Sequence, residues 1–163
     1  MKIDYSLYLV TEESVPINDL LRIVEQAVQG GVTIVQLREK RSDGKIFYEK
    51  AARLKELLSS YSVPLIINDR VDIALAVEAE GVHIGQKDLP LEQVRKIVPE
   101  SMIVGVSAST IEEGKKAERE GADYLGIGAV FPTGTKQDAK VLPEGMLERV
   151  AQSVSIPSVA IGG

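Results

Sequence analysis

Residues 30–40 read Gly-Gly-Val-Thr-Ile-Val-Gln-Leu-Arg-Glu-Lys, and this stretch contains the pattern that decides the fold. Two glycines precede a short β-branched run, and the run ends abruptly in polar and charged residues. A run of this length and composition is typical of a buried strand. Glycine is the usual residue just past a helix, because it accepts a positive φ without penalty. The stretch therefore predicts a helix end, a buried strand and a polar strand end, in that order.

The same pattern recurs along the chain. Glycine precedes an apolar run again at Gly81 and at Gly121. Seven apolar runs are separated by segments with helical spacing. The runs are 3–10, 32–37, 63–67, 82–84, 102–106, 124–130 and 156–161. Strands that alternate with helices predict right-handed βαβ units around a parallel sheet.

The pattern predicts an α/β fold, a TIM-type (β/α)8 barrel that here covers about seven strands and six helices. A complete barrel typically needs roughly 200 residues or more. The chain has 163 residues, so we expect an incomplete barrel in a single domain over 1–163. An open, flavodoxin-like sheet is the alternative. The outer strands would be exposed as edges, which makes self-association through them possible.

Composition favours a globular protein and excludes several kinds of site. The chain has no cysteine and one histidine, which excludes disulfides, a cysteine nucleophile, thiolate metal sites and multi-histidine metal sites. No apolar stretch approaches the roughly 20 residues that span a membrane. No secretory signal is visible at the N-terminus. We therefore expect a cytoplasmic protein.

Charge and aromatic content argue against a nucleic-acid partner. The formal net charge is −5, and the chain has two Phe, five Tyr and no Trp. Nucleic-acid binding usually leaves a basic footprint and uses aromatic stacking platforms. The cations Arg38, Lys40 and Lys136 do not belong to a general positive field, so they indicate a local anionic ligand. We expect phosphorylated small molecules as partners, with no nucleic acid and no membrane.

Six of the strand endings carry residues that suit a phosphorylated substrate held with a metal. The endings are 36–40, 68–70, 86–88, Ser107, 133–136 and 162–163. The parallel strands of an α/β barrel keep their chemistry at their C-terminal ends. We therefore expect the six endings to converge on one site.

The first ending predicts a phosphate-binding row. Alternate residues of a strand share a face, so Gln36, Arg38 and Lys40 would point one way. Leu37 and Glu39 would point the other way. Arginine binds phosphate oxygens bidentately, and lysine supplies a point charge. A solvated strand end is the alternative interpretation.

The remaining endings each admit a functional and a structural interpretation. Asp69 and Asp88 could share Mg²⁺, completed by water and phosphate oxygens, or each could cap the following helix. The loop 133–136 could cradle an oxyanion or be a turn. Ser107 has no base beside it in its motif, so a hydrogen-bonding role is more plausible than a nucleophilic one. We interpret His83 as a core histidine rather than a catalytic base.

As a set, these motifs resemble the thiamine-phosphate synthase family. The matching motifs are Gln-Leu-Arg-Glu-Lys at 36–40, Asn-Asp-Arg at 68–70, Gly-Val-His-Ile-Gly-Gln-Lys-Asp at 81–88, Gly-Val-Ser at 105–107, Phe-Pro-Thr-Gly-Thr-Lys at 131–136 and Ile-Gly-Gly at 161–163. Their order, spacing and strand-end placement agree from Tyr8 to the last residue. The resemblance implies a (β/α)8 barrel and a Mg²⁺-dependent transferase of thiamine biosynthesis. This enzyme couples hydroxymethylpyrimidine diphosphate with thiazole phosphate, forming thiamine phosphate and releasing pyrophosphate.

The resemblance also implies a role for each strand end. The residues that would bind the pyrimidine diphosphate are Gln36, Leu37, Arg38, Glu39, Lys40, Asn68, Ser107 and Lys136. Those that would bind the thiazole phosphate are Thr133, Gly134, Thr135 and Gly163. Asp69 and Asp88 would bind Mg²⁺. Arg38, Lys40 and Lys136 would neutralise the departing diphosphate, so no protein nucleophile is needed.

Length sets the chain apart from the family. Family members continue for roughly one more strand and two helices, so we expect a C-terminally truncated barrel of reduced or no activity. The alternatives are a thiazole tautomerase-like barrel enzyme, another barrel enzyme acting on a sugar phosphate, and a non-catalytic phosphate-binding fragment. The Asp69 and Asp88 pair argues against the tautomerase, because an isomerase has no diphosphate to neutralise.

Overall fold

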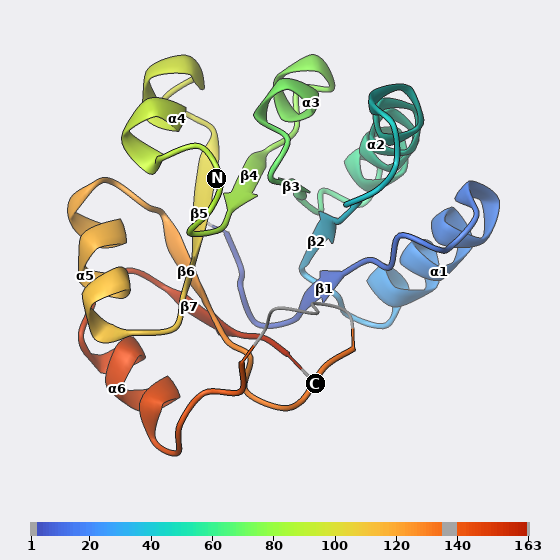
Figure 1. Ribbon diagram of the computed structural model, residues 1–163. Helices are drawn as coiled ribbons and strands as arrows, with labels where there is room; N and C mark the ends of the chain where they lie inside the picture. The colour runs from blue at the N-terminus through green and yellow to red at the C-terminus, as the bar shows by residue number, and fades with distance from the viewer. Residues whose placement is uncertain (1–2, 135–139, 163) are drawn as a thin grey trace. The chain divides into compact units, whose positions relative to one another are not determined.

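The computed structural model describes residues 3–134 and 140–162, and in these residues seven strands alternate with six helices (Figure 1). The strands are β1 (Tyr8–Val10), β2 (Ile34–Leu37), β3 (Leu65–Asn68), β4 (Gly81–Ile84), β5 (Ile103–Ala108), β6 (Tyr124–Ile127) and β7 (Ser158–Ala160). The helices are α1 (Ile17–Gln29), α2 (Gly44–Ser59), α3 (Val71–Ala76), α4 (Leu91–Ile97), α5 (Ile111–Arg119) and α6 (Met146–Gln152). Each strand falls within or beside one of the predicted apolar runs.

The strand order is that of a TIM-type barrel fold. Hydrogen-bonded neighbours follow the chain order from β1 to β7. The pairings of β1 with β2, β2 with β3, β5 with β6 and β6 with β7 are all parallel. A flavodoxin-like sheet would instead have the crossed order 2-1-3-4-5. The predicted TIM-type (β/α) fold is therefore confirmed, and the flavodoxin-like alternative is not what forms.

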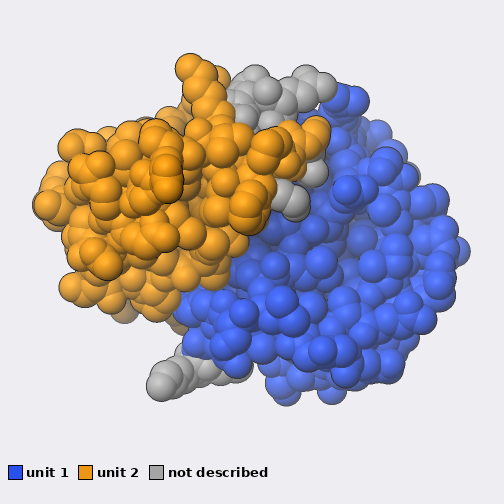
Figure 2. Space-filling view, turned by 90° about the horizontal axis from the view of Figure 1, so that it is seen from below, with its two compact units in different colours: residues 1–82 blue, residues 83–163 orange. Residues whose placement is uncertain are grey.

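The chain divides into two compact units, residues 1–82 (unit 1) and 83–163 (unit 2), as Figure 2 shows by colour. The division falls inside β4. The single domain expected over residues 1–163 stays a prediction.

In unit 1 the strands β2 and β3 are buried on both faces, whereas β1 is half-buried. Every residue of β2 and of β3 is buried, as is typical of parallel strands that helices cover. Helix α1 packs against α2, and α2 and α3 both pack against β3. Helix α2 buries one apolar stripe, made of Phe47, Ala51, Leu54 and Leu58. This spacing of three to four residues is what an amphipathic helix requires.

In unit 2 two glycines make room for two rings. Gly105 of β5 lies opposite Tyr124 of β6, and a Cβ added at Gly105 would lie 2.1 Å from Tyr124 Cζ. A Cβ added at Gly126 would lie 2.9 Å from His83 Cε1. Both rings are buried, so β5 and β6 need glycine at these two positions. Helices α5 and α6 pack against β6.

The longest helix of the described residues is α2, with 16 residues. Among residues 3–134 and 140–162, no helix combines the length and the apolar character that crossing a membrane requires.

Candidate active site

In unit 1 the predicted site residues lie where two strands end. Residues 36–40 run from the last residues of β2 into the loop that leads to α2. Asn68 is the last residue of β3, and Asp69 follows it directly. The predicted alternation continues into the loop, because Glu39 is buried whereas Arg38 is half-buried and Lys40 is exposed.

Gln36 is held in place by its neighbouring strand. Its side chain is only 4% exposed. Its Nε2 donates a hydrogen bond to the hydroxyl of Tyr8 at 2.7 Å. The side-chain amide is therefore oriented within the protein itself.

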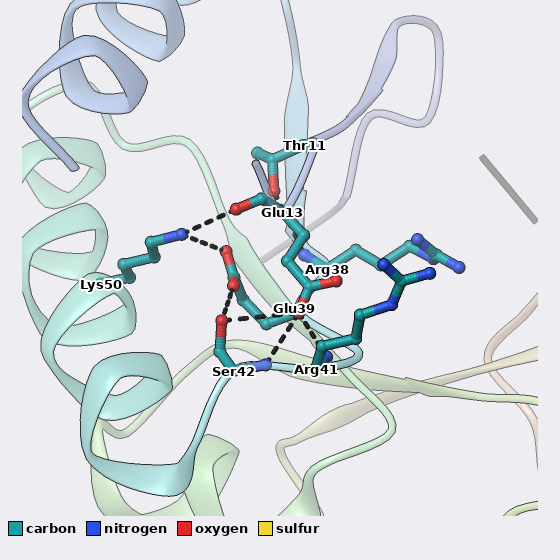
Figure 3. A network of polar contacts seen from close by, with 7 residues as sticks. All are labelled: Thr11, Glu13, Arg38, Glu39, Arg41, Ser42 and Lys50. Atoms are coloured by element: carbon teal, nitrogen blue, oxygen red, sulfur yellow. Dashed lines mark hydrogen bonds and ion pairs between the residues drawn. The ribbon is translucent and has the colours of Figure 1, made fainter. Parts of the chain in front are cut away.

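Leu37 and Glu39 turn their side chains into the protein. Leu37 is fully buried, and the Glu39 carboxylate lies 2.7 Å from Lys50 Nζ (Figure 3). The hydroxyl of Ser42 donates to the other oxygen of the same carboxylate. A substrate contact at Leu37 or Glu39 would therefore come from the backbone.

Arg38 presents its side chain outward. Its backbone N–H donates to Thr11 Oγ1 at 3.2 Å, but within the described residues its guanidinium makes no hydrogen bond or ion pair. In Figure 3 the side chain runs away from the pair of Glu39 and Lys50. A guanidinium carries five N–H donors in a planar fork, which suits bidentate binding of a phosphate.

Lys40 forms an ion pair with Asp69. The two side chains are 42% and 19% exposed, so the pair lies at the edge of the protein interior. Asp69 has a φ of 61°, in the left-handed region that aspartate tolerates better than most residues. The end of β3 thus places a predicted metal ligand against a predicted phosphate-binding cation.

Asn68 carries a buried donor without an acceptor. The residue is 6% exposed, and its Nδ2 has no hydrogen-bond partner among the described residues. A buried donor left unsatisfied costs about 1–3 kcal/mol. An acceptor oxygen of a bound ligand would satisfy this amide, so Asn68 marks the end of β3 as a binding position.

In unit 2 the loop after β4 is closed by Asp88. Its Oδ2 accepts a hydrogen bond from the N–H of Gly85 at 2.7 Å. The N-cap residues of α3 and α4 are Arg70 and Pro90, so neither aspartate is the N-cap residue of the next helix.

Ser107, the penultimate residue of β5, belongs to a chain of hydrogen bonds around the histidine. His83 Nε2 lies 2.9 Å from Ser107 Oγ, and His83 Nδ1 lies 2.9 Å from Tyr124 Oη. Gln86 Nε2 donates to the backbone carbonyl of Ser107 at 2.7 Å. His83 is 7% exposed, as expected for a core histidine. It orients the serine hydroxyl.

The loop after β6 is described only in part. Thr133 is half-buried and Gly134 is exposed, with open space where a Cβ would lie. Thr135, Lys136 and Gly163 lie outside the described residues. Their predicted roles stay predictions.

The donor chemistry fits Mg²⁺. No group of three or more His, Asp or Glu residues that could hold a metal occurs in the described part of the chain. Mg²⁺ does not require such a cage, because it is usually held by one or two carboxylates together with substrate phosphates and water. Asp69 and Asp88 each carry carboxylate oxygens of this kind.

Sequence patterns missed the residues that support the cationic segment. Glu13 accepts hydrogen bonds from the N–H groups of Arg41 and Ser42, the second at 2.8 Å. Burial raises the pKa of Glu13, but hydrogen bonds from the N–H groups of Arg41, Ser42 and Lys40 and the positive charge of Arg41 together lower it by more, so the pKa lies below its ordinary value. The only available signal was Lys50, a charged residue on the buried face of α2.

Comparison with known proteins gives a consistent result. A family profile described as thiamine monophosphate synthase matches residues 7–163. The chain is 53% identical over 161 residues to the thiamine-phosphate synthase of Methanobrevibacter smithii, covering 99% of this chain and 77% of that protein. It is 56% identical over 162 residues to the thiamine-phosphate synthase of Clostridium tetani, covering 99% and 78%.

A solved structure supports the same family assignment. The thiamine phosphate pyrophosphorylase of Pyrococcus furiosus superposes with a TM-score of 0.85 at 40% identity. The match covers 96% of this chain and 74% of that one. The two proteins are therefore similar in the fold of the backbone as well as in sequence.

Proposed function

Because the chain belongs to the thiamine-phosphate synthase family, we propose that it couples hydroxymethylpyrimidine diphosphate with thiazole phosphate. The products are thiamine phosphate and pyrophosphate. The bond between the pyrimidine methylene carbon and the diphosphate oxygen breaks, and the thiazole nitrogen forms a new bond to that carbon. The diphosphate leaves with the bonding electron pair, so its negative charge has to be stabilised.

The observation that carries the proposal is the buried donor of Asn68. Its Nδ2 has no acceptor among the described residues, and the residue directly precedes Asp69, which is paired with Lys40. Arg38 adds a guanidinium that has no internal partner in the described chain. These groups supply what a diphosphate needs, namely hydrogen-bond donors and positive charge.

Asp69 and Asp88 would hold Mg²⁺, which would act as a Lewis acid on the diphosphate oxygens. Gln36 and Ser107 would hydrogen-bond the pyrimidine diphosphate, with Lys136 as a further cation. Gln36 and Ser107 are suited to this role because Tyr8 and His83 already hold their side chains. A site whose groups are oriented in advance loses less entropy on binding.

The thiazole phosphate would be bound by the loop after β6. Thr133, Gly134, Thr135 and Gly163 would supply hydroxyl and backbone N–H groups, which suit an oxyanion. The reaction needs alignment of the thiazole nitrogen with the methylene carbon, and two separately bound phosphates provide it. A cytoplasmic location stays a prediction.

The alternative of a thiazole tautomerase-like enzyme is not favoured. An isomerase has no leaving diphosphate, whereas this chain keeps both aspartates and the cations of residues 36–40. The relatives are also named synthases. A non-catalytic phosphate-binding fragment would bind the diphosphate with Mg²⁺ but form no product.

The decisive experiment incubates both substrates with Mg²⁺ and measures thiamine phosphate and pyrophosphate. We expect Arg38→Ala to lower kcat/KM on the order of a hundredfold, because one stabilising donor to the leaving group is lost. Asp88→Ala and Lys136→Ala should each abolish most of the Mg²⁺-dependent coupling.

Arg53→Ala is the matched control, because Arg53 is an arginine of α2 outside the strand ends. It should couple the substrates at the rate of the unmodified chain. Unchanged coupling in Arg38→Ala, Asp88→Ala and Lys136→Ala would overturn the proposal. Binding without any product in the unmodified chain would instead favour the phosphate-binding fragment.

A further inference from the structure

The loop between β2 and α2 is anchored by a buried lysine. Lys50 Nζ lies 2.7 Å from Glu39 Oε1 and donates to the backbone carbonyl of Glu13 at 3.1 Å (Figure 3). The side chains of Lys50 and Glu39 are 9% and 0% exposed. Removing two charges from water is costly, and a buried ion pair is weak evidence for a gain in stability. Its position points to another role.

The same two glutamates hold the loop from its other side. Ser42 Oγ donates to Glu39, and Ser42 N donates to the Glu13 carboxylate at 2.8 Å. Arg41 N donates to the same Glu13 oxygen. Lys50 therefore contacts both glutamates that hold Arg41 and Ser42, and it does so from a helix rather than from the loop itself.

Glu39 lies between the two cations of the predicted phosphate row. Glu39 is buried, whereas Arg38 is half-buried and Lys40 is exposed, so the burial of these three loop residues alternates as it would in a strand. A rotation of the backbone that released Glu39 would turn both neighbouring side chains. The contact between Glu39 and Lys50 opposes such a rotation, in addition to the ion pair that Lys40 forms with Asp69.

We propose that Lys50 is a positioning residue for diphosphate recognition. By joining the Glu39 carboxylate to the Glu13 carbonyl, it holds the loop in the conformation that presents Arg38 and Lys40 to the substrate. The inference rests on the proposed function, because it takes the diphosphate as the ligand of these cations.

The test measures calorimetric binding of inorganic pyrophosphate in the presence of Mg²⁺, so that it does not depend on turnover. Lys50→Met removes the anchor, and Lys50→Met with Glu39→Gln removes it without leaving an unpaired buried charge. Lys50→Arg restores the positive charge. Lys55→Met is the matched control, because Lys55 lies on the same helix and pairs with Glu80. Thermal unfolding checks that each variant is folded.

We expect Lys50→Met and the double variant to bind pyrophosphate on the order of tenfold to a hundredfold more weakly, since small misplacements of binding groups cost this much. Lys50→Arg should recover most of the affinity, and Lys55→Met should bind like the unmodified chain. Where both substrates turn over, the KM for the pyrimidine diphosphate should rise while that for the thiazole phosphate stays constant.

Unchanged pyrophosphate affinity in the folded double variant would overturn the inference. Weak binding in Lys50→Met that the added Glu39→Gln change restores would also overturn it, because charge balance alone would then explain the effect. If the unmodified chain neither binds pyrophosphate nor couples the substrates, the proposed function itself fails. A failure of the inference alone leaves coupling and binding by the unmodified chain intact.

Discussion

The two units hold their strand-end side chains by different chemistry. In unit 1 the segment after β2 is held by the charged groups of Glu13, Glu39 and Lys50. In unit 2 the hydroxyl of Ser107 is held by His83, whose ring also contacts Tyr124. A carboxylate accepts hydrogen bonds from several N–H donors best while it is ionised. An imidazole contacts two hydroxyl groups, one at each ring nitrogen, and its tautomer decides which nitrogen donates and which accepts. The ring must also be tightly packed. The first kind of support relies on charged groups, and the second requires room for two buried rings.

The largest expected effect tests how closely the interior of unit 2 is packed around Tyr124. Gly105→Ala would place a Cβ 2.1 Å from Cζ of the Tyr124 ring, which is fully buried. We expect the free energy of unfolding to fall by about 3 kcal/mol, as for other overpacked cores. Urea unfolding measures it.

Gly134→Ala is the control for this change, because no atom of the described residues lies within 4 Å of its added Cβ. It should leave the free energy of unfolding unchanged. If Gly105→Ala were equally harmless, the ring of Tyr124 would not be confined, and packing would not be what supports Ser107.

The next effect concerns the tautomer of His83. Tyr124→Phe removes the hydroxyl that His83 Nδ1 contacts at 2.9 Å, and we expect a cost of about 1–2 kcal/mol. The chain has one histidine, so its imidazole nitrogen signals in an NMR spectrum need no assignment. Their pattern should change in Tyr124→Phe. Tyr48→Phe, at an exposed tyrosine of α2, should alter neither stability nor signals, and an unaltered spectrum in both variants would contradict the prediction.

The smallest effect tests the pH dependence of unit 1. The pKa of Glu13 is lowered below its ordinary value of 4.5. Its stabilising contribution is therefore fully present above that value and is lost as the pH falls through the lower pKa of the folded state. Glu13→Gln should cost up to about 1 kcal/mol at neutral pH, and the difference from the unmodified chain should shrink below pH 4.5.

Unfolding measured as a function of pH tests this expectation. Glu12→Gln is the control, since Glu12 is the exposed neighbour of Glu13. A cost of Glu13→Gln that stays constant from neutral to acid pH would mean that the ionised Glu13 carboxylate is not what holds the segment after β2.

Much of the fold could be predicted because it depends on local patterns. The β-branched runs predicted all the strands of the described chain, and the helical spacing between the runs 32–37 and 63–67 predicted a helix where α2 forms. The positions of Asn68 and Asp69 at a strand end followed from the same reasoning. The pairing of Lys40 with Asp69 did not, because those residues are 29 positions apart and either could have met another charge.

The sequence by itself determined the order of strands and helices, the family and which residue types stand at the strand ends, because these depend on periodicity and on motifs that are continuous along the chain. Only the tertiary structure decided that Glu39 turns inward to Lys50, that Glu13 reaches Ser42 29 residues away, and that Asn68 keeps a buried donor without an acceptor in the part of the chain described. Such contacts join segments that are distant in sequence, so their partners are decided by how the elements pack and by which groups lose their contact with water.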